Sequence, residues 1–129
     1  MHTHSDSRII VLAAGGTGGH IFPAVALAEV LRARGYAPHL ITDHRFHQYN
    51  KTSSDGVLGQ IPIHTIRAGS LGGGVLRKVK NTLGIGVGVL QAWCLLRRLK
   101  PHAAVGFGGY PSFPTMVASI LSGQRTMIH

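Results

Sequence analysis

A glycine-rich segment that ends in a histidine is the part of the sequence best suited to chemistry. Residues 15–20 have the sequence GGTGGH and follow a short apolar run, RIIVLAA, at residues 8–14. Such a run is typical of a strand buried on both faces. A helix is predicted to start at Pro23, so the glycines precede a helix N-terminus, where unpaired backbone N–H groups and the helix dipole favour an anion. The segment therefore predicts close binding of a phosphate group, with a purely structural turn as the alternative.

The spacing of these glycines excludes two common nucleotide sites. Counted from Gly16, the dinucleotide fingerprint G-x-G-x-x-G needs a third glycine at position 21, where the sequence has Ile21. A P-loop is excluded as well, because no Gly-Lys-Ser/Thr follows the glycines. Asp43 ends a predicted strand where Rossmann proteins place a ribose-binding acid, but without the fingerprint this interpretation is weak.

Two further features point to the same edge of the sheet. His20 can act as a general base or as a hydrogen-bond donor, and the alternative is a histidine that packs or caps the helix. Residues 106–112, GFGGYPS, follow another predicted strand. Loops after parallel strands share one edge, so this loop and the first would line a common cleft, where Tyr110 and Ser112 could bond sugar or phosphate oxygens. The alternative is a plain strand–helix connection.

The elements around these loops predict an α/β fold with a Rossmann-like parallel sheet. Gly35 and Gly123 are suited to helix C-termini, and helices are expected to start at Pro23 and at Thr115. Residues 75–100 are predicted as one broken helix or two helices, and residues 44–59 as a polar loop. The organisation is a polar tail at residues 1–7 and one domain at residues 8–129. Strands are predicted at residues 8–14, 38–43, 61–66, 102–107 and 124–129.

The composition limits the class of protein. The 129 residues fit one domain, and 44% hydrophobic residues suffice for a core. Thirteen Lys and Arg against four Asp and Glu give a formal net charge of +9, which favours an anionic partner: a nucleic acid, a phosphorylated ligand or an anionic membrane. The lone Cys94 excludes an internal disulfide and fits a reducing compartment. The sequence shows neither a secretory signal nor an apolar run of the 18 residues or so that a spanning helix needs.

Residues 75–100 carry apolar positions at helical spacing between basic ends. This pattern favours peripheral contact with an anionic membrane, and the alternative is a core helix with solvated ends. Gly84 and Gly88 would either break the helix or let another backbone pack closely. The apolar stripe consists of Leu76, Val79, Leu83, Val87 and Leu90. The residues expected at the membrane are Leu76, Arg77, Lys78, Val79, Lys80, Leu83 and Trp93.

No metal site is expected. The histidines that might suggest one are His2, His4, His44 and His47, and the sequence offers one cysteine and few acids to complete a ligand set.

The two glycine motifs, in this order, resemble the MurG family of peptidoglycan N-acetylglucosaminyltransferases. The motifs that carry the resemblance are residues 15–20 with Pro23 and residues 26–28, and residues 106–112 with Pro114, and the match to the family's N-terminal domain runs along nearly the whole chain from Arg8. It implies the N-terminal half of a GT-B fold. It also implies inverting transfer of N-acetylglucosamine from UDP-N-acetylglucosamine to lipid I, giving lipid II, at the cytoplasmic face of the bacterial cell membrane. No cofactor and no nucleic-acid partner are implied.

The resemblance also implies roles for individual residues. His20 matches the family's proposed catalytic base, and Thr17, Gly18 and Gly19 match positions that touch the donor. His129 matches the first residue of a His-Glu-Gln-Asn segment, so we expect the donor domain to lie beyond this chain, and the chain alone to be inactive. The alternatives are another Rossmann-type nucleotide-binding enzyme and a non-catalytic membrane-binding module. The acceptor diphosphate would be held by Gly15, Gly16, Thr17, Gly18, Gly19, Gly108, Gly109 and Tyr110.

Overall fold

Five parallel strands form one sheet in the computed structural model, which describes residues 8–15, 17–46, 57–68 and 74–129. The strand order is β3-β2-β1-β4-β5, so the first apolar run forms the central strand, as expected for a run without polar alternation. All neighbours pair in parallel, and their carboxyl ends therefore meet at one edge. The predicted α/β fold with a parallel sheet is confirmed. The strands are β1 (Ile9–Ala13), β2 (Ala37–Thr42), β3 (Ile63–Thr65), β4 (Ala103–Gly106) and β5 (Arg125–Ile128).

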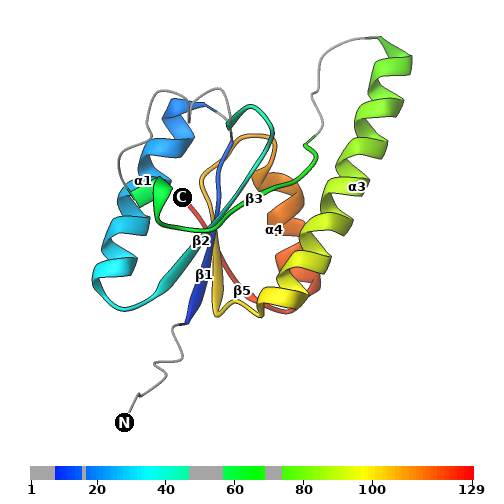
Figure 1. Ribbon diagram of the computed structural model, residues 1–129. Coiled ribbons are helices and arrows are strands. Elements are labelled where there is room, and N and C mark those ends of the chain that lie inside the picture. Colours follow the sequence, from blue (N-terminus) through cyan, green and yellow to red (C-terminus); the bar gives the residue numbers. More distant parts are fainter. Residues whose placement is uncertain (1–7, 16, 47–56, 69–73) are drawn as a thin grey trace.

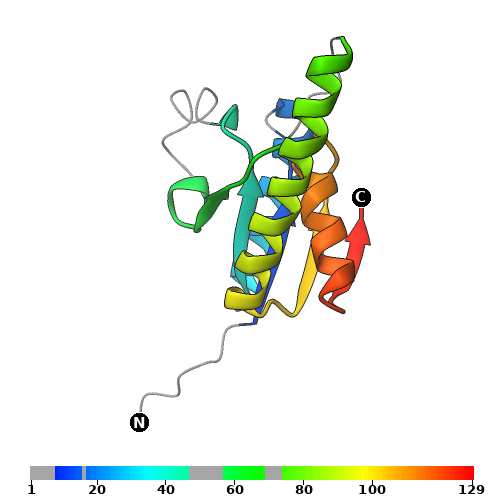
Figure 2. The same ribbon diagram turned by 90° about the vertical axis from the view of Figure 1, so that its right-hand side faces the viewer.

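Helices cover both faces of this sheet. Helix α1 (Gly18–Ala33) lies on one face, and α3 (Val75–Leu99) and α4 (Ser112–Leu121) lie together on the other (Figure 1). A short 3₁₀ turn, η1 (Val57–Gly59), precedes β3. Figure 2 shows α3 and α4 side by side and the upper turns of α3 rising beyond the sheet. That upper end is the N-terminal end of α3, on the side of the carboxyl ends of the strands.

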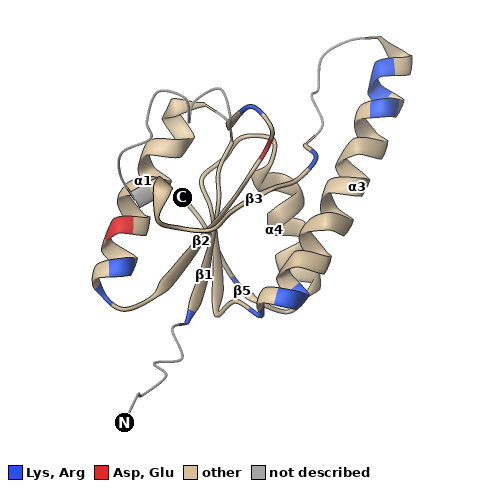
Figure 3. Cartoon of the chain, in the orientation of Figure 1, with Lys and Arg blue, Asp and Glu red and all other residues tan. Residues whose placement is uncertain are grey.

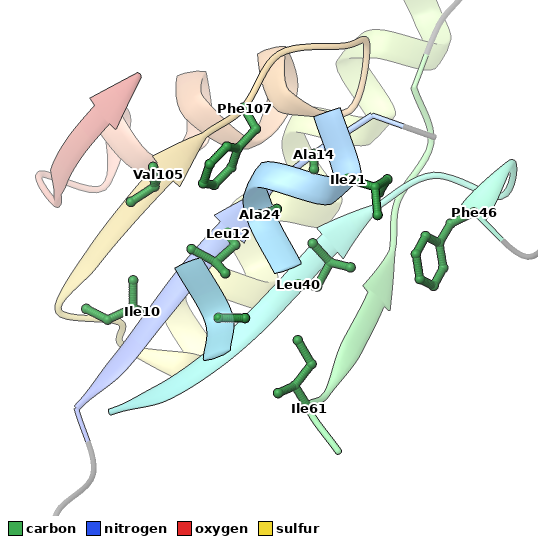
Figure 4. Packing of buried hydrophobic residues seen from close by; sticks show 11 residues of the cluster. Ile10, Leu12, Ala14, Ile21, Ala24, Leu40, Phe46, Ile61, Val105 and Phe107 are labelled. Atoms are coloured by element: carbon green, nitrogen blue, oxygen red, sulfur yellow. The ribbon is translucent and has the colours of Figure 1, made fainter. Parts of the chain in front are cut away.

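Alternation along the central strands divides the core into two layers. Ile10, Leu12 and Leu40 point toward α1, where they pack with Ile21 and Ala24 (Figure 4). The intervening positions, Val11 and Ile41 among them, pack instead with buried residues of α3 and α4, which are Ala92, Leu96 and Ala118. Phe46 is 1% exposed and joins the α1 layer, so the prediction of a polar loop at residues 44–59 is wrong at this position.

The helices begin earlier than predicted. Helix α1 starts at Gly18 rather than at Pro23, because the Thr17 carbonyl accepts hydrogen bonds from the His20 and Ile21 N–H groups, both at 3.1 Å. The second half of the GGTGGH segment is therefore the first helical turn, and Pro23 lies inside the helix. Helix α4 likewise starts at Ser112 instead of Thr115. The predicted C-terminal glycines are confirmed, since Gly35 and Gly123 have φ of +83° and +71°.

Helix α3 is one continuous helix, so the predicted break is wrong. Its packing seam consists of Gly88, Ala92 and Leu96, which are buried. A Cβ on Gly88 would collide with the Arg67 carbonyl oxygen, so this glycine permits the close packing that was one of its two predicted roles. Nothing lies within 4 Å of a Cβ built on Gly84.

The expectation that no segment could span a membrane is also contradicted for α3. The helix has 25 residues and contains an 18-residue window of mean hydropathy 1.3, so by length and composition it could cross a bilayer. No apolar run in α3 is long enough to span a bilayer without interruption, but isolated polar residues within the helix leave its mean hydropathy high. Only 17% of that window is buried inside the domain.

Candidate functional site

The two glycine loops touch each other at the carboxyl edge of the sheet. The Gly15 N–H donates to the Gly108 carbonyl at 3.0 Å, since β1 and β4 are neighbours in the sheet. A Cβ on Gly109 would lie 2.6 Å from the Cα of Gly15, and one on Gly15 would lie 2.9 Å from the Cα of Gly109. Side chains never come this close, so the contact requires glycine on both sides. We call Gly15, Gly108 and Gly109 the glycine clasp.

Ser112 ties the clasp to the sheet. Its buried hydroxyl donates to the Ala13 carbonyl at 2.8 Å and accepts from the Gly108 N–H at 3.2 Å. These bonds join the end of β1 to the loop after β4. The suggestion that Ser112 bonds sugar or phosphate oxygens is therefore wrong. The residue is only 5% exposed, and its hydroxyl already makes two hydrogen bonds to the backbone. Its neighbour Tyr110 is exposed, as a ligand contact must be.

The His20 ring lies against the clasp. A Cβ on Gly108 would be 3.0 Å from His20 Cε1, and one on Gly109 would be 3.4 Å from His20 Cδ2. The side chain is half-buried, and within the described residues neither ring nitrogen has a hydrogen-bond partner. The ring does not cap α1, which has no side-chain cap bond at its N-terminus. The imidazole is thus held by packing on glycine, with its nitrogens available to a ligand.

The N-terminus of α1 opens beside this ring. Thr17 is the N-cap residue and is exposed, as is Gly19 in the first turn. A Cβ built on Gly19 meets nothing within 4 Å, so open space lies over this part of the helix end. The first turn contains no acidic residue, and its positive dipole end is therefore not neutralised locally. Gly16, which the sequence also placed in this site, lies outside the described residues.

A cation that the sequence analysis missed lies at the same edge. The Arg45 guanidinium pairs with the Asp43 carboxylate at 2.5 Å and lies 5.4 Å from the centroid of the Tyr110 ring. Asp43 is fully buried and also accepts a bond from the Arg45 N–H at 3.2 Å, so it is not free for a ribose hydroxyl. The Arg45 side chain remains 38% exposed. The sequence signal that could have predicted this cation is the position of Arg45, two residues after the aspartate that ends a predicted strand.

The last residue of the chain also reaches this edge. The His129 N–H donates to the Gly106 carbonyl at 2.8 Å, and its ring stacks on Phe107 with centroids 5.4 Å apart. The clasp, His20, Arg45 and His129 therefore come from segments that follow β1, β2, β4 and β5.

The residues expected at the membrane fall into two groups. Leu76, Val79 and Leu83 are 82%, 54% and 66% exposed, and with Val87 and Leu90 they form an uncovered apolar stripe along the outer side of α3. Arg77, Lys78 and Lys80 are exposed on the same turns, and Figure 3 shows this basic group at the upper end of the helix. Trp93 does not belong to this group. It packs against the core beside the sheet, with the Arg97 guanidinium 4.8 Å above its ring.

Among the described residues, no three His, Cys, Asp or Glu side chains lie close enough together to hold a metal ion. His44 is exposed, and His2, His4 and His47 lie outside the described residues.

The fold and the paired loops define a Rossmann-like α/β domain whose ligand edge is built from backbone rather than from a dinucleotide fingerprint. The family model of the glycosyltransferase family 28 N-terminal domain matches residues 10–129. The chain therefore belongs to glycosyltransferase family 28 as its N-terminal domain.

Individual relatives agree with this assignment. The UDP-N-acetylglucosamine–N-acetylmuramyl-(pentapeptide) pyrophosphoryl-undecaprenol N-acetylglucosamine transferase of Rhodospirillum centenum is 53% identical over 110 residues, which cover 85% of this chain and 28% of the relative. The enzyme of the same name from Paramagnetospirillum magneticum is 48% identical over 97% of this chain and 33% of its own length. The crystal structure of Acinetobacter baumannii MurG superposes with a TM-score of 0.77 at 33% identity, over 95% of this chain and 35% of that one. This chain thus spans about a third of the length of these relatives.

Proposed function

We propose that this chain is the acceptor-binding domain of an inverting N-acetylglucosaminyltransferase, which moves N-acetylglucosamine from UDP-N-acetylglucosamine to lipid I and so makes lipid II for the cell wall. The observation that carries the proposal is the packing of the His20 ring on the glycine clasp beside the open N-terminus of α1. This arrangement supplies a base and an anion-binding surface next to each other. The names of the relatives supply the substrates.

The acceptor diphosphate fits the backbone surface of the two loops. In this proposal Gly15, Gly16, Gly108 and Gly109 line its path, and the dipole at the N-terminus of α1 attracts its charge. Tyr110 contributes its hydroxyl from the loop after β4. Arg45, whose charge is balanced by Asp43, adds the exposed N–H groups of its guanidinium at the rim, a contribution that the glycine motifs alone did not predict.

His20 would act on the acceptor hydroxyl. A neutral imidazole removes the proton as the hydroxyl oxygen attacks the anomeric carbon, and the bond from that carbon to the UDP oxygen breaks on the opposite side. The configuration at the anomeric carbon is therefore inverted, and UDP leaves with the bonding electrons. Of the residues expected at the donor, Thr17 and Gly19 are exposed and would face it, and Gly18, which is buried between them, would take part only through its backbone.

The experiment joins residues 8–129 to the remaining part of the Rhodospirillum centenum relative, because 53% identity favours a compatible domain contact. Transfer of radiolabelled N-acetylglucosamine from UDP-N-acetylglucosamine to lipid I is measured, with the intact relative as the positive control and this chain alone as the negative one. We expect lipid II from the fusion. A folded fusion that binds UDP-N-acetylglucosamine but forms no lipid II would contradict the proposal.

We further propose that the outer side of α3 rests on the cytoplasmic face of the cell membrane. The cations Arg77, Lys78 and Lys80 and the first residues of the apolar stripe belong to the N-terminal turns of α3. These turns rise past the carboxyl edge of the sheet, which is the edge of the clasp (Figure 1). A lipid-linked acceptor would thus reach the clasp from the bilayer. The seam of Gly88, Ala92 and Leu96 keeps the other half of α3 packed on the domain, which favours peripheral contact over a spanning helix.

Co-sedimentation with vesicles of phosphatidylglycerol and phosphatidylcholine tests this contact. Each Lys or Arg near an anionic surface contributes about 1 kcal/mol, so replacing Arg77, Lys78 and Lys80 with Gln should weaken binding by about 100-fold. Raising the salt concentration should weaken it too, because the Debye length falls from about 10 Å at 0.1 M to about 3 Å at 1 M. Folded chain that stays in the supernatant at low salt would refute the membrane proposal.

A further inference from the structure

A second basic surface lies at the end of the sheet opposite to the clasp. Arg8 precedes β1, Lys100 and His102 precede β4, and Arg125 begins β5. These strands are neighbours in the order β1-β4-β5, so their amino ends bring the side chains together. They line a hollow of about 930 Å³, with the Gly123 and Gln124 turn at one side. We call this hollow the amino-edge pocket.

The charge there is not balanced by the described protein. Figure 3 shows basic residues at the lower ends of the strands and helices, whereas the described acids are Glu29 on α1 and Asp43 at the carboxyl edge. Neither acid lines the pocket. Within the described ranges Asp43 forms an ion pair with Arg45, and Arg8, Lys100 and Arg125 have no carboxylate partner there.

The negative ends of helix dipoles offset part of this positive charge but not all of it. The C-termini of α1, α3 and α4 lie at this end of the sheet, and each carries about half a negative charge. The pocket and the smaller hollow beside it, which share Arg8, are lined by four cations, the fourth being Arg34. Three helix ends balance fewer than two of these charges, so a substantial positive surplus remains among the described residues at this edge.

The backbone at Lys100 provides an independent observation. This residue ends α3 in the left-handed region at φ 48°, where helices usually have glycine, and no other non-glycine residue in the described part of the chain has a positive φ. The position therefore has a lysine despite the steric cost of its Cβ. That cost is explained if the ammonium group at this corner of the pocket serves a ligand.

We propose that the amino-edge pocket binds a phosphate-bearing anion. Arginine forks and an ammonium group are the side chains that recognise phosphate oxygens, and the hollow is large enough for a diphosphate or a phospholipid headgroup. This site is separate from the clasp, since it lies at the other end of the parallel strands. It is also distant from the basic turns of α3, because that helix of 25 residues is about 37 Å long.

The test uses inorganic pyrophosphate as the probe and backbone amide NMR of the 129-residue chain at constant ionic strength. The amide signals of His102, Gly123 and Gln124 are expected to shift and to reach a plateau as the pyrophosphate concentration rises. They are read separately from shifts at Gly19, Gly108 and Gly109, so binding at the clasp does not affect the outcome. The combined variant Arg8→Gln, Lys100→Gln, Arg125→Gln should raise the dissociation constant at the amino-edge pocket at least about tenfold.

A matched control separates a specific site from net charge. The variant Arg77→Gln, Lys78→Gln, Lys80→Gln loses the same three charges and should leave the pocket's dissociation constant within about threefold of the unsubstituted chain. Lys100→Gly should raise the midpoint of thermal unfolding, because glycine suits a positive φ, and yet weaken pyrophosphate binding.

Vesicles that contain phosphatidylglycerol form the second arm. If the source is a lipid headgroup, the Arg8, Lys100 and Arg125 variant loses vesicle binding beyond the loss caused by the α3 control. If the source is a soluble phosphate, pyrophosphate saturates the pocket. In that case the α3 control loses vesicle binding, whereas the Arg8, Lys100 and Arg125 variant binds vesicles as the unsubstituted chain does. Absence of saturable shifts at His102, Gly123 and Gln124 together with unchanged vesicle binding would overturn the proposal. If the two triple variants raise the dissociation constant of pyrophosphate at the amino-edge pocket equally, the proposal is overturned too.

Discussion

Replacing Gly109 by alanine tests whether contact between the two loops builds the site. Gly109 has φ +81°, and a Cβ there would come 2.6 Å from the Gly15 Cα and 3.1 Å from the Gly15 nitrogen. A non-glycine residue in the left-handed region costs about 1–2 kcal/mol, and forcing a methyl group against fixed backbone costs about 1–3 kcal/mol. We expect Gly109→Ala to lower the free energy of unfolding by about 3 kcal/mol.

Gly123→Ala is the matched control. Gly123 has a similar φ of +71°, but a Cβ there meets nothing within 4 Å, so its cost should be about 1 kcal/mol and come from the backbone conformation alone. Urea unfolding of both variants, followed by circular dichroism, measures the difference. Equal losses in the two variants would refute the close contact of Gly15 with Gly109, and with it the glycine clasp.

Three smaller predictions follow from neighbouring parts of the structure. Gly19→Ala should leave the free energy of unfolding unchanged or raise it by up to about 1 kcal/mol, because its Cβ meets open space on a helix, yet it should abolish lipid II formation in the fusion protein by filling the ligand's space. Ser112→Ala should cost about 1–3 kcal/mol in urea unfolding, since it leaves the buried Gly108 N–H without a partner and removes one of the two hydrogen bonds to the Ala13 carbonyl, and a loss below about 0.5 kcal/mol would contradict that role. Burial lowers the pKa of both His39 and His64, and for His39 the charge of the stacked His64 lowers the pKa further. Their neutral forms are therefore favoured in the folded state, so stability should be full above the ordinary value of 6.5 and fall as the pH drops through the lowered pKa values, and His64→Gln should reduce that fall.

The sheet and its ligand edge could be predicted from the sequence because they depend on local patterns. A continuous apolar run at residues 8–14 indicates a central strand, and glycine segments after two such strands must share an edge in a parallel sheet. The helical end glycines Gly35 and Gly123 were equally clear, since positive φ favours glycine.

What the sequence could not predict depends on contacts between distant segments. Pro23 was expected to start α1. The helix begins more than one turn earlier, at Gly18, because the Thr17 carbonyl accepts hydrogen bonds from the His20 and Ile21 N–H groups. Ser112 was assigned to the ligand because its partners, Ala13 and Gly108, come together only in the folded sheet. Arg45 was overlooked for the same reason, since its neighbour Tyr110 lies far away in the sequence.

The orientation of α3 also required the structure. Its apolar stripe and its buried seam both have helical spacing, so periodicity alone allowed either side to face the core. The seam of Gly88, Ala92 and Leu96 packs inward, with Gly88 letting the Arg67 backbone approach closely and with Ala92 and Leu96 joining the core cluster on this face of the sheet. The larger residues of the stripe are left outside, which is the arrangement that the membrane proposal needs.

The kinetics of His20→Ala in the fusion protein test the central claim most directly. If His20, held on the glycine clasp, removes the proton from the acceptor hydroxyl, its loss should lower kcat about 100-fold or more and leave the KM for lipid I within a few-fold. If kcat instead stays within a few-fold of the unsubstituted protein and KM alone rises, His20 serves only to bind the acceptor, and the catalytic role assigned to it is wrong.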